Sequence, residues 1–237
     1  VVVASGSDSE HTSNRLAELR KVAQLGVHSI AMPRLLGFGD LTAPHRIRKL
    51  AGELGVTIVH GHGAKGGLYA RLASKSLTNT VAIYTPHGGA LHYDPRSLLG
   101  SIFMMIERKM LLSTDALLFE SAYAKRVYQE KVGQARCIQP VIHNGLRPEE
   151  FVPQAPNGSQ ADFVFVGELR KLKGLDVLIE ALAGLRTPNG RPATLVIAGD
   201  GPDRDELKTK VSRLGLDTSV QFLGVQPARQ MFARGKC

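Results

Sequence analysis

The chain alternates short runs of β-branched and apolar residues with longer amphipathic segments along most of its length. The apolar runs predict strands at 1–4, 27–31, 56–60, 80–85, 116–119, 136–142, 163–166, 194–198 and 220–223. Helical periodicity predicts helices at 13–25, 44–54, 68–76, 97–112, 122–131, 175–185, 202–214 and 228–234. Glycine-rich loops are predicted at 35–43 and 61–67. Strands that alternate with helices form parallel sheets with helices on both faces, so we predict an α/β fold. In such sheets, ligands bind beyond the carboxyl ends of the strands.

The alternation lapses between Phe151 and Ala161, where proline, asparagine, glycine and serine are typical of a linker. We therefore predict two doubly wound, Rossmann-like domains, residues 1–153 and 154–237, with the second one incomplete. Two such domains facing each other would form a cleft lined by loops from the carboxyl ends of their strands. Because the chain begins inside a predicted strand and ends directly after a predicted helix, we expect it to be a fragment of a longer protein.

The composition favours an anionic partner. The formal net charge is +9, and Lys and Arg are spread over both halves of the chain. Nucleotides and lipid head groups fit this charge, whereas few aromatic residues lie among the basic ones, which argues against nucleic acid as a partner. The two cysteines, Cys137 and Cys237, form no disulfide framework and no metal spacing, which suits a reducing cytoplasm. No apolar stretch is long enough to span a membrane, and no signal peptide is visible.

The segment after the strand at 163–166, which is predicted to be buried, has the features of a phosphate site. Gly167 and Gly174 enclose a loop with three cations, and a helix follows. The first amides of such a helix are unpaired donors at the positive end of its dipole. Arg170 and Lys173 would add full positive charges, and the two glycines would let the backbone approach a ligand. The alternative is a solvated basic loop between two core elements.

The segment Gly61–Gly66 formally matches the G-x-G-x-x-G pattern of dinucleotide sites. That pattern needs an acidic residue at the end of the next strand to hold the ribose. The next predicted strand ends in Thr85–Gly89, which contains no carboxylate, so we do not expect a dinucleotide.

Four histidines lie near the ends of two predicted strands, namely His60, His62, His87 and His92. They have no Cys or carboxylate companion and match no common zinc spacing, so we expect no metal site. We expect His62 and His87 to project from the strand ends as donors to a substrate. For His62 the alternative is a helix-capping or backbone-paired role.

Two more loops of the second half lie where a ligand would bind. Gly199 and Gly201 follow a predicted strand, and their lack of side chains would let a base or ribose approach. Acidic residues in the first turn of the next helix disfavour phosphate there. Val225 follows the last predicted strand and would offer backbone contacts.

Seven short segments lie in a fixed order over nearly the whole chain. They are V-H-G-H-G-A-K-G-G (59–67), T-P-H-G (85–88), E-S-A-Y (120–123), V-I-H-N-G (141–145), V-G-E-L-R-K-L-K-G-L-D-V-L-I-E-A (166–181), I-A-G-D-G-P (197–202) and F-L-G (222–224). Each segment alone is unspecific. In their order and spacing they resemble the GT-B glycosyltransferases of family 4, the retaining class also called glycosyl transferases group 1.

The resemblance implies that the second domain binds a UDP- or GDP-sugar and that the first presents the acceptor. It places Lys173 on the donor diphosphate and makes His87, beside the transferred sugar, the catalytic residue. The other donor-binding residues would be Gly167, Arg170, Gly174, Gly199, Gly201 and Val225, and the acceptor-side residues His62 and Lys65. The family uses neither metal nor cofactor, and cations and helix amides stabilise the departing diphosphate. The family has Arg where this chain has Glu168, so Arg170 is expected to supply that charge.

We therefore expect the parent protein to transfer a sugar to a lipid-linked or saccharide acceptor in cell-envelope or exopolysaccharide synthesis. The family's E-x7-E segment would follow Cys237, so this chain alone is expected to be inactive. The positive charge of residues 1–150 suits peripheral contact with the inner, cytoplasmic face of the cell membrane. The alternatives are a non-catalytic nucleotide-binding module and a GT-B sugar epimerase.

Overall fold

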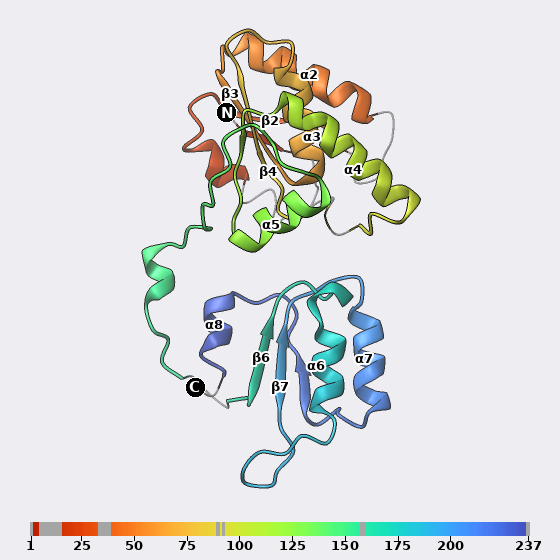
Figure 1. The fold of residues 1–237 in the computed structure, drawn as a ribbon. Helices are drawn as coiled ribbons and strands as arrows, with labels where there is room; N and C mark the ends of the chain where they lie inside the picture. The colour runs from red at the N-terminus through yellow and green to blue at the C-terminus, as the bar shows by residue number, and fades with distance from the viewer. Residues whose placement is uncertain are drawn as a thin grey trace. The chain divides into compact units, whose positions relative to one another are not determined.

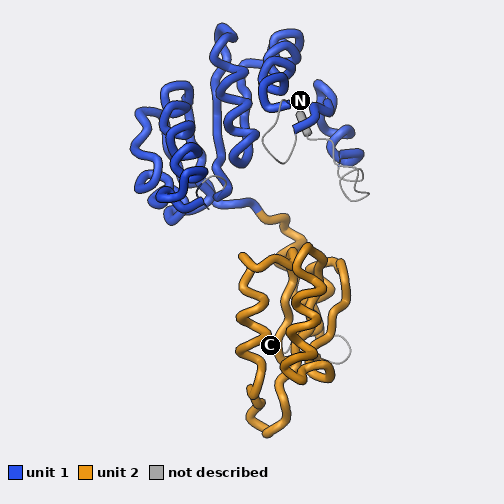
Figure 2. Tube along the Cα trace, turned by 90° about the vertical axis from the view of Figure 1, so that its right-hand side faces the viewer, with its two compact units in different colours: residues 1–145 blue, residues 146–237 orange. Residues whose placement is uncertain are grey.

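The computed structural model describes residues 2–4, 16–32, 39–88, 91, 93–156 and 160–235. It divides into two compact units, Val1–Gly145 (unit 1) and Leu146–Cys237 (unit 2), shown separately coloured in Figure 2. Both units contain parallel strands and helices, which confirms the predicted α/β class. Parts of the predicted loop at 35–43, the predicted linker and His92 lie outside the described residues.

Unit 1 contains two groups of parallel strands. β1 (Val2–Ala4) pairs with β2 (Val27–Ser29), and β3 (Ile58–His62), β4 (Val81–Thr85) and β5 (Ala116–Leu117) form a sheet in that order. The helices are α2 (Gly39–Glu53), α3 (Gly63–Ser74), α4 (Leu98–Met110) and α5 (Ala122–Lys131) (Figure 1). Ser97 and Ser121 begin α4 and α5, because each hydroxyl oxygen accepts a hydrogen bond from a first-turn amide.

A buried ion pair ties α3 to α4. The Arg71 guanidinium donates to both carboxylate oxygens of Glu107, each at 3.0 Å, and its Nε donates to the Gly67 carbonyl. The hydroxyls of Tyr84 on β4 and Tyr128 on α5 donate to the same carboxylate. Burial, reinforced by the Glu107 charge, raises the pKa of both tyrosines. Four elements of unit 1 thus share one buried polar network.

The buried face of α4 differs from the one that the sequence pattern predicts. The pattern favours Leu98, Ile102, Met105 and Ile106 as the core face, but Leu98 is 81% exposed and Met105 61% exposed. Met104 and Glu107 are buried instead. The helix is apolar on nearly all sides, so its periodicity does not select a face. The buried face instead carries Glu107, which pairs with Arg71, together with Gly100 and Met104.

The junction between β3 and α3 is also displaced from the prediction. The strand runs to His62 and the helix begins at Gly63, within the loop predicted at 61–67. A Cβ at Gly61 would overlap the backbone of Gly66, and one at Gly67 would overlap the Tyr84 ring. These glycines therefore let α3 pack directly on β3 and β4, which is one ordinary use of a glycine-rich strand–helix junction.

Two other elements depart from the sequence prediction. α2 begins at Gly39, inside the loop predicted at 35–43, and its first turn is anchored by the ion pair of Asp40 with Lys65. The strand predicted at 136–142 is reduced to isolated bridges that pair Ile138 and Val141 with the β5 segment. Pro140 explains this interruption, because proline has no N–H to donate to the ladder.

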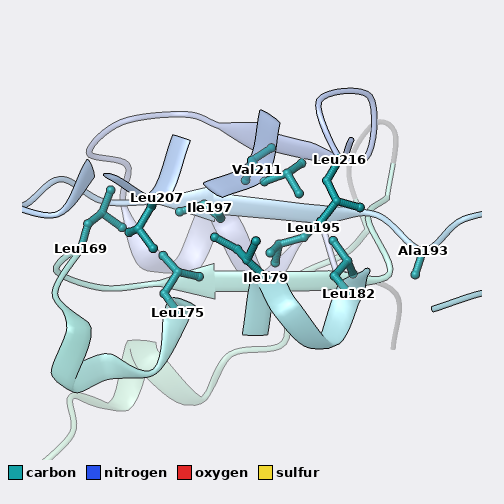
Figure 3. Packing of buried hydrophobic residues seen from close by; sticks show 11 residues of the cluster. Leu169, Leu175, Ile179, Leu182, Ala193, Leu195, Ile197, Leu207, Val211 and Leu216 are labelled. Atoms are coloured by element: carbon teal, nitrogen blue, oxygen red, sulfur yellow. The ribbon is translucent and has the colours of Figure 1, made fainter. Parts of the chain in front are cut away.

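Unit 2 is a three-stranded parallel sheet in the order β6 (Phe163–Val166), β7 (Leu195–Ala198) and β8 (Val220–Phe222). α6 (Leu175–Leu182) and α7 (Arg204–Arg213) cover one face, and α8 (Ala228–Phe232) lies on the other (Figure 1). Leu195 and Ile197 of β7 pack with the leucines of α6 and α7, as Figure 3 shows. Val196 and Ala198 pack against Met231 of α8.

The strand predicted to be buried at 163–166 is only partly so. Phe163 is 40% exposed and Val166 36% exposed, whereas all four residues of β7 are buried. β6 is an end strand of the described sheet and β7 is the central one. An apolar run alone does not distinguish these two positions.

Candidate functional site

The loops that follow β6 and β7 are joined by backbone hydrogen bonds at the carboxyl edge of the sheet in unit 2. The Gly167 amide donates to the Ala198 carbonyl at 3.0 Å, and the Leu169 amide donates to the Asp200 carbonyl at 3.0 Å. The Leu169 side chain is fully buried among the core residues (Figure 3). The loop around Gly167 is therefore held by two kinds of contact. Leu169 anchors it in the core, and backbone hydrogen bonds join it to the loop that follows β7.

The loop after β8 joins the same edge. The Gly199 amide donates to the Gly224 carbonyl at 2.7 Å. Val225, the next residue after Gly224, therefore lies close to the loop that follows β7. The Val225 side chain is 76% exposed. The structure thus brings together the three loops that the sequence assigns to the donor, namely those of Gly167–Gly174, Gly199–Gly201 and Val225.

Gly199 and Gly201 have a structural reason to lack side chains. Gly199 has a φ of 143°, and a Cβ there would overlap the Gly167 carbonyl oxygen. A Cβ at Gly201 would overlap the backbone of Leu169. Both glycines permit the close approach of the two loops, so contact with a nucleotide is not needed to account for them.

Replacing Gly199 with alanine is expected to destabilise unit 2 more than replacing Gly174. Gly174 has a φ of 70° and open space around it, so alanine there adds only left-handed backbone strain, about 1–2 kcal/mol. Alanine at Gly199 adds an overlap with neighbouring backbone to an unfavourable φ. Urea unfolding of the two variants checks this order. Equal losses of stability would contradict the role given to the loop–loop contact.

The predicted phosphate loop ends in a short helical turn. Lys171–Lys173 form a 3-10 turn, Gly174 takes a left-handed conformation, and α6 begins at Leu175. The Lys173 side chain is exposed and makes no ion pair with any described residue. It lies one residue before the N-cap of α6, whose first amides are free of helical partners. Asp176, in the first turn of α6, has a buried Oδ1 without a hydrogen-bond partner among the described residues.

Arg170 is paired with the acid that precedes it. Its Nε lies 2.8 Å from Oε1 of Glu168, and the contact is an ion pair without hydrogen-bond geometry. The charge that the sequence assigns to a diphosphate is thus partly neutralised by Glu168. Lys171 and Lys173 are both exposed, and neither makes an ion pair with a described residue. Of the two, Lys173 lies nearer the start of α6.

In unit 1, three histidines lie together at the carboxyl ends of β3 and β4. His62 Nδ1 is 3.0 Å from His87 Nε2, and the two rings are stacked with their centroids 5.3 Å apart. His60 Nε2 lies 2.9 Å from Thr85 Oγ1, and the centroids of the His60 and His62 rings are 4.1 Å apart. Burial, followed by the neighbouring histidines, lowers the pKa of His60 and His62. His62 and His87, predicted to project from the strand ends, are thus brought into contact with each other.

Lys65 is directed to α2. Its Nζ lies 2.7 Å from Oδ1 of Asp40, and the Tyr69 hydroxyl donates to the same carboxylate. The sequence assigns Lys65 to the acceptor side but gives no sign of Asp40, which lies in a segment expected to be a loop. The sequence gives no sign of a role for Glu120 either. It follows β5 at the same edge as the histidines, and its Oε2 is buried without a hydrogen-bond partner among the described residues.

Within the described residues, no group of three or more histidine, cysteine, aspartate or glutamate side chains is arranged to hold a metal ion. None of the described helices is both long enough and apolar enough to cross a membrane.

Comparison with known proteins relates both units to sugar-transfer enzymes. The profile described as "Glycosyltransferase Family 4" matches residues 1–150, and "Glycosyl transferases group 1" matches residues 147–234. The O-antigen biosynthesis glycosyltransferase WbnH of Escherichia coli is 27% identical over 197 residues, covering 81% of this chain and 54% of the relative. The GDP-mannose-dependent alpha-(1-6)-phosphatidylinositol monomannoside mannosyltransferase of Mycolicibacterium smegmatis is 24% identical over 222 residues. The match covers 89% of this chain and 56% of that relative. The chain spans about half the length of these curated relatives.

Among solved structures, HepE of Anabaena in complex with UDP and glucose is similar to this chain with a TM-score of 0.65 and 18% sequence identity. The match covers 89% of this chain and 59% of HepE. At this level of identity the likeness concerns the fold alone.

Proposed function

Because the chain belongs to glycosyltransferase family 4 and has the GT-B fold, we propose that the intact protein transfers a sugar from a UDP- or GDP-sugar to an acceptor with retention of anomeric configuration. The observation that supports this most is the meeting of three loops at one edge of unit 2. There, the exposed Lys173 stands beside the first amides of α6. This arrangement suits a diphosphate group.

In the proposed reaction, the bond between the anomeric carbon and a diphosphate oxygen breaks, and a bond to the acceptor oxygen forms. The departing nucleoside diphosphate takes the electron pair of the broken bond, and one of its oxygens accepts the proton that the acceptor hydroxyl loses. Lys173 and the helix amides would stabilise the negative charge that develops on this leaving group. Arg170 contributes less in this account, because Glu168 competes for its charge.

We assign His87 a place beside the transferred sugar. It lies two residues beyond the end of β4, at the carboxyl edge of the sheet in unit 1, where ligands of parallel sheets bind, and its side chain is exposed. An imidazole in its neutral form provides one hydrogen-bond donor and one acceptor, which suits sugar hydroxyls.

The acceptor proposed here is a lipid-linked or saccharide chain of the cell envelope. Two observations support this choice. One relative is described by its role in O-antigen biosynthesis and another by a phosphatidylinositol mannoside substrate. The strong basic charge of the chain suits an anionic acceptor such as a lipid diphosphate.

We further propose that α4 contacts the inner face of the cell membrane. Its exposed side carries Leu98, Leu99, Ile102 and Met105, and the basic residue Lys109 follows them. An apolar helix face beside basic residues is the pattern of interfacial helices on anionic bilayers.

Replacing both Leu98 and Met105 with glutamate is expected to reduce sedimentation of the protein with phosphatidylglycerol vesicles, because charges replace the apolar contact. Leu41→Glu is the matched control, since Leu41 is 77% exposed on α2. Equal sedimentation of the double variant and the parent would contradict this assignment of the membrane contact.

A screen of UDP- and GDP-sugars with the intact protein and envelope-derived acceptors tests the proposed transfer. Formation of a glycoside with the donor's anomeric configuration is the expected result. Nucleotide binding without any transfer would favour the non-catalytic module, and conversion of the donor sugar without an acceptor would favour the epimerase.

A further inference from the structure

His87 has an unusual backbone and an exposed side chain. Its φ of 49° lies in the left-handed region, which few residues other than glycine adopt. The imidazole extends from a turn and not from a strand or helix, so secondary structure does not fix its orientation. A side chain that must meet a sugar in one orientation needs a neighbour to hold it.

His62 is the neighbour that contacts the His87 ring. Its Nδ1 lies 3.0 Å from His87 Nε2, and the two rings are nearly parallel, at 22°. His62 occupies the N-cap position of α3, yet its side chain makes no capping hydrogen bond. The capping role considered from the sequence is therefore excluded, and the ring nitrogen is directed to His87 instead.

The His62 ring is itself in contact with a second histidine. It lies against the His60 ring, whose Nε2 is 2.9 Å from the Thr85 hydroxyl. The parallel register sets His62 opposite Thr85, so β3 and β4 together position the whole row of side chains. A continuous line of side-chain contacts thus runs from the sheet to the exposed ring, through Thr85, His60, His62 and His87 in that order.

The charge state of His62 suits a fixed hydrogen bond. Burial, with the electrostatic effect of His87 as a second cause, lowers the pKa of His62, which favours the neutral form of its ring. Lys65, three residues after His62 in the chain, is paired with Asp40 of α2. A neutral ring offers one N–H and one free nitrogen, so its contact with His87 Nε2 has a single proton between the two nitrogens.

We propose that His62 is a positioning residue that holds His87 through Nε2 and leaves His87 Nδ1 as the nitrogen presented to the substrate. The part of this inference that concerns substrate rests on the proposed function. The part that concerns the His87 tautomer does not. His62 acts through His87 and does not touch the reacting atoms.

Nitrogen-detected NMR of the histidine rings at pH 7 tests the tautomer directly. In the parent protein His87 is expected to give the two distinct ring-nitrogen shifts of a single tautomer. In His62→Ala these shifts are expected to move toward the average of exchanging tautomers. His62→Asn should restore them, because the asparagine amide can reach the place of the Nδ1 nitrogen. Unchanged His87 shifts in His62→Ala would overturn the proposal.

Kinetics of the intact protein supply the second arm. His62→Ala is expected to lower kcat by on the order of 10- to 100-fold with little change in the donor KM, because a misplaced group costs mainly the chemical step. His62→Asn should recover most of kcat, and His45→Ala on α2 should leave it unchanged. A loss that falls wholly on KM would overturn the positioning role. If no variant transfers sugar, the proposed function fails, and the NMR result still decides the tautomer.

Discussion

Replacing Glu107 with alanine is expected to lower the free energy of unfolding of unit 1 by about 3–5 kcal/mol, the usual cost of breaking a buried ion pair. The substitution leaves the Arg71 guanidinium without its carboxylate, and water cannot replace that partner because Arg71 is completely inaccessible to solvent. It also removes the acceptor of the Tyr84 and Tyr128 hydroxyls. The loss therefore spreads over α3, α4, α5 and β4.

Urea unfolding monitored by circular dichroism measures this loss. Glu53→Ala is the matched control, because Glu53 forms an exposed pair with Lys49 on α2 and should change stability by less than about 1 kcal/mol. The double variant Arg71→Met with Glu107→Leu is expected to recover part of the stability, since it leaves no buried charge behind. A Glu107→Ala variant as stable as the Glu53→Ala control would contradict the structural role of the network.

Replacing His87 with alanine in the intact protein is expected to lower kcat by about 10²–10³-fold, the range for losing one preorganised hydrogen-bond donor at a reacting centre. Affinity for the free nucleotide is expected to stay within a few-fold of the parent. The reason is that His87 lies in unit 1, whereas the loops assigned to the nucleotide lie in unit 2.

The measurements are initial rates of transfer and the Kd for UDP or GDP, made on the same preparations. His45→Ala is the control, since it removes an exposed histidine from α2 of the same unit. Transfer at the parent rate would remove His87 from the mechanism. A large loss of nucleotide affinity would place His87 on the donor instead of the sugar.

The sequence predicts the order of the elements because strand and helix periods are local properties. It also predicts which loops meet at the edge of unit 2, since the carboxyl ends of parallel strands share one edge. The contact between Gly199 and Gly167 follows from that topology.

Contacts that depend on tertiary geometry could not be predicted from the sequence. The ion pair of Arg71 with Glu107 joins residues far apart in the chain, and it places a charged residue on the buried face of α4. The contact between His62 and His87 depends on the register of β3 with β4. The pairing of Arg170 with Glu168 depends on the local conformation before the 3-10 turn, and the charges alone suggested a free cation.

The central claim, that the loop between Gly167 and Gly174 binds a nucleoside diphosphate, is tested most directly by calorimetric titration. The protein is titrated with UDP and GDP and with the matching monophosphates. The parent is expected to prefer one diphosphate to its monophosphate. Lys173→Ala should weaken diphosphate binding by about 10- to 100-fold, the value of a charge-assisted hydrogen bond, and should reduce that preference.

Arg170→Ala is expected to have a smaller effect, because Glu168 already holds the arginine. Arg213→Ala is the control, since Arg213 lies at the C-terminal end of α7, away from the carboxyl edge of the sheet. The account predicts a loss of diphosphate affinity in Lys173→Ala and none in Arg213→Ala. Unchanged affinity in both Lys173→Ala and Arg170→Ala would contradict it.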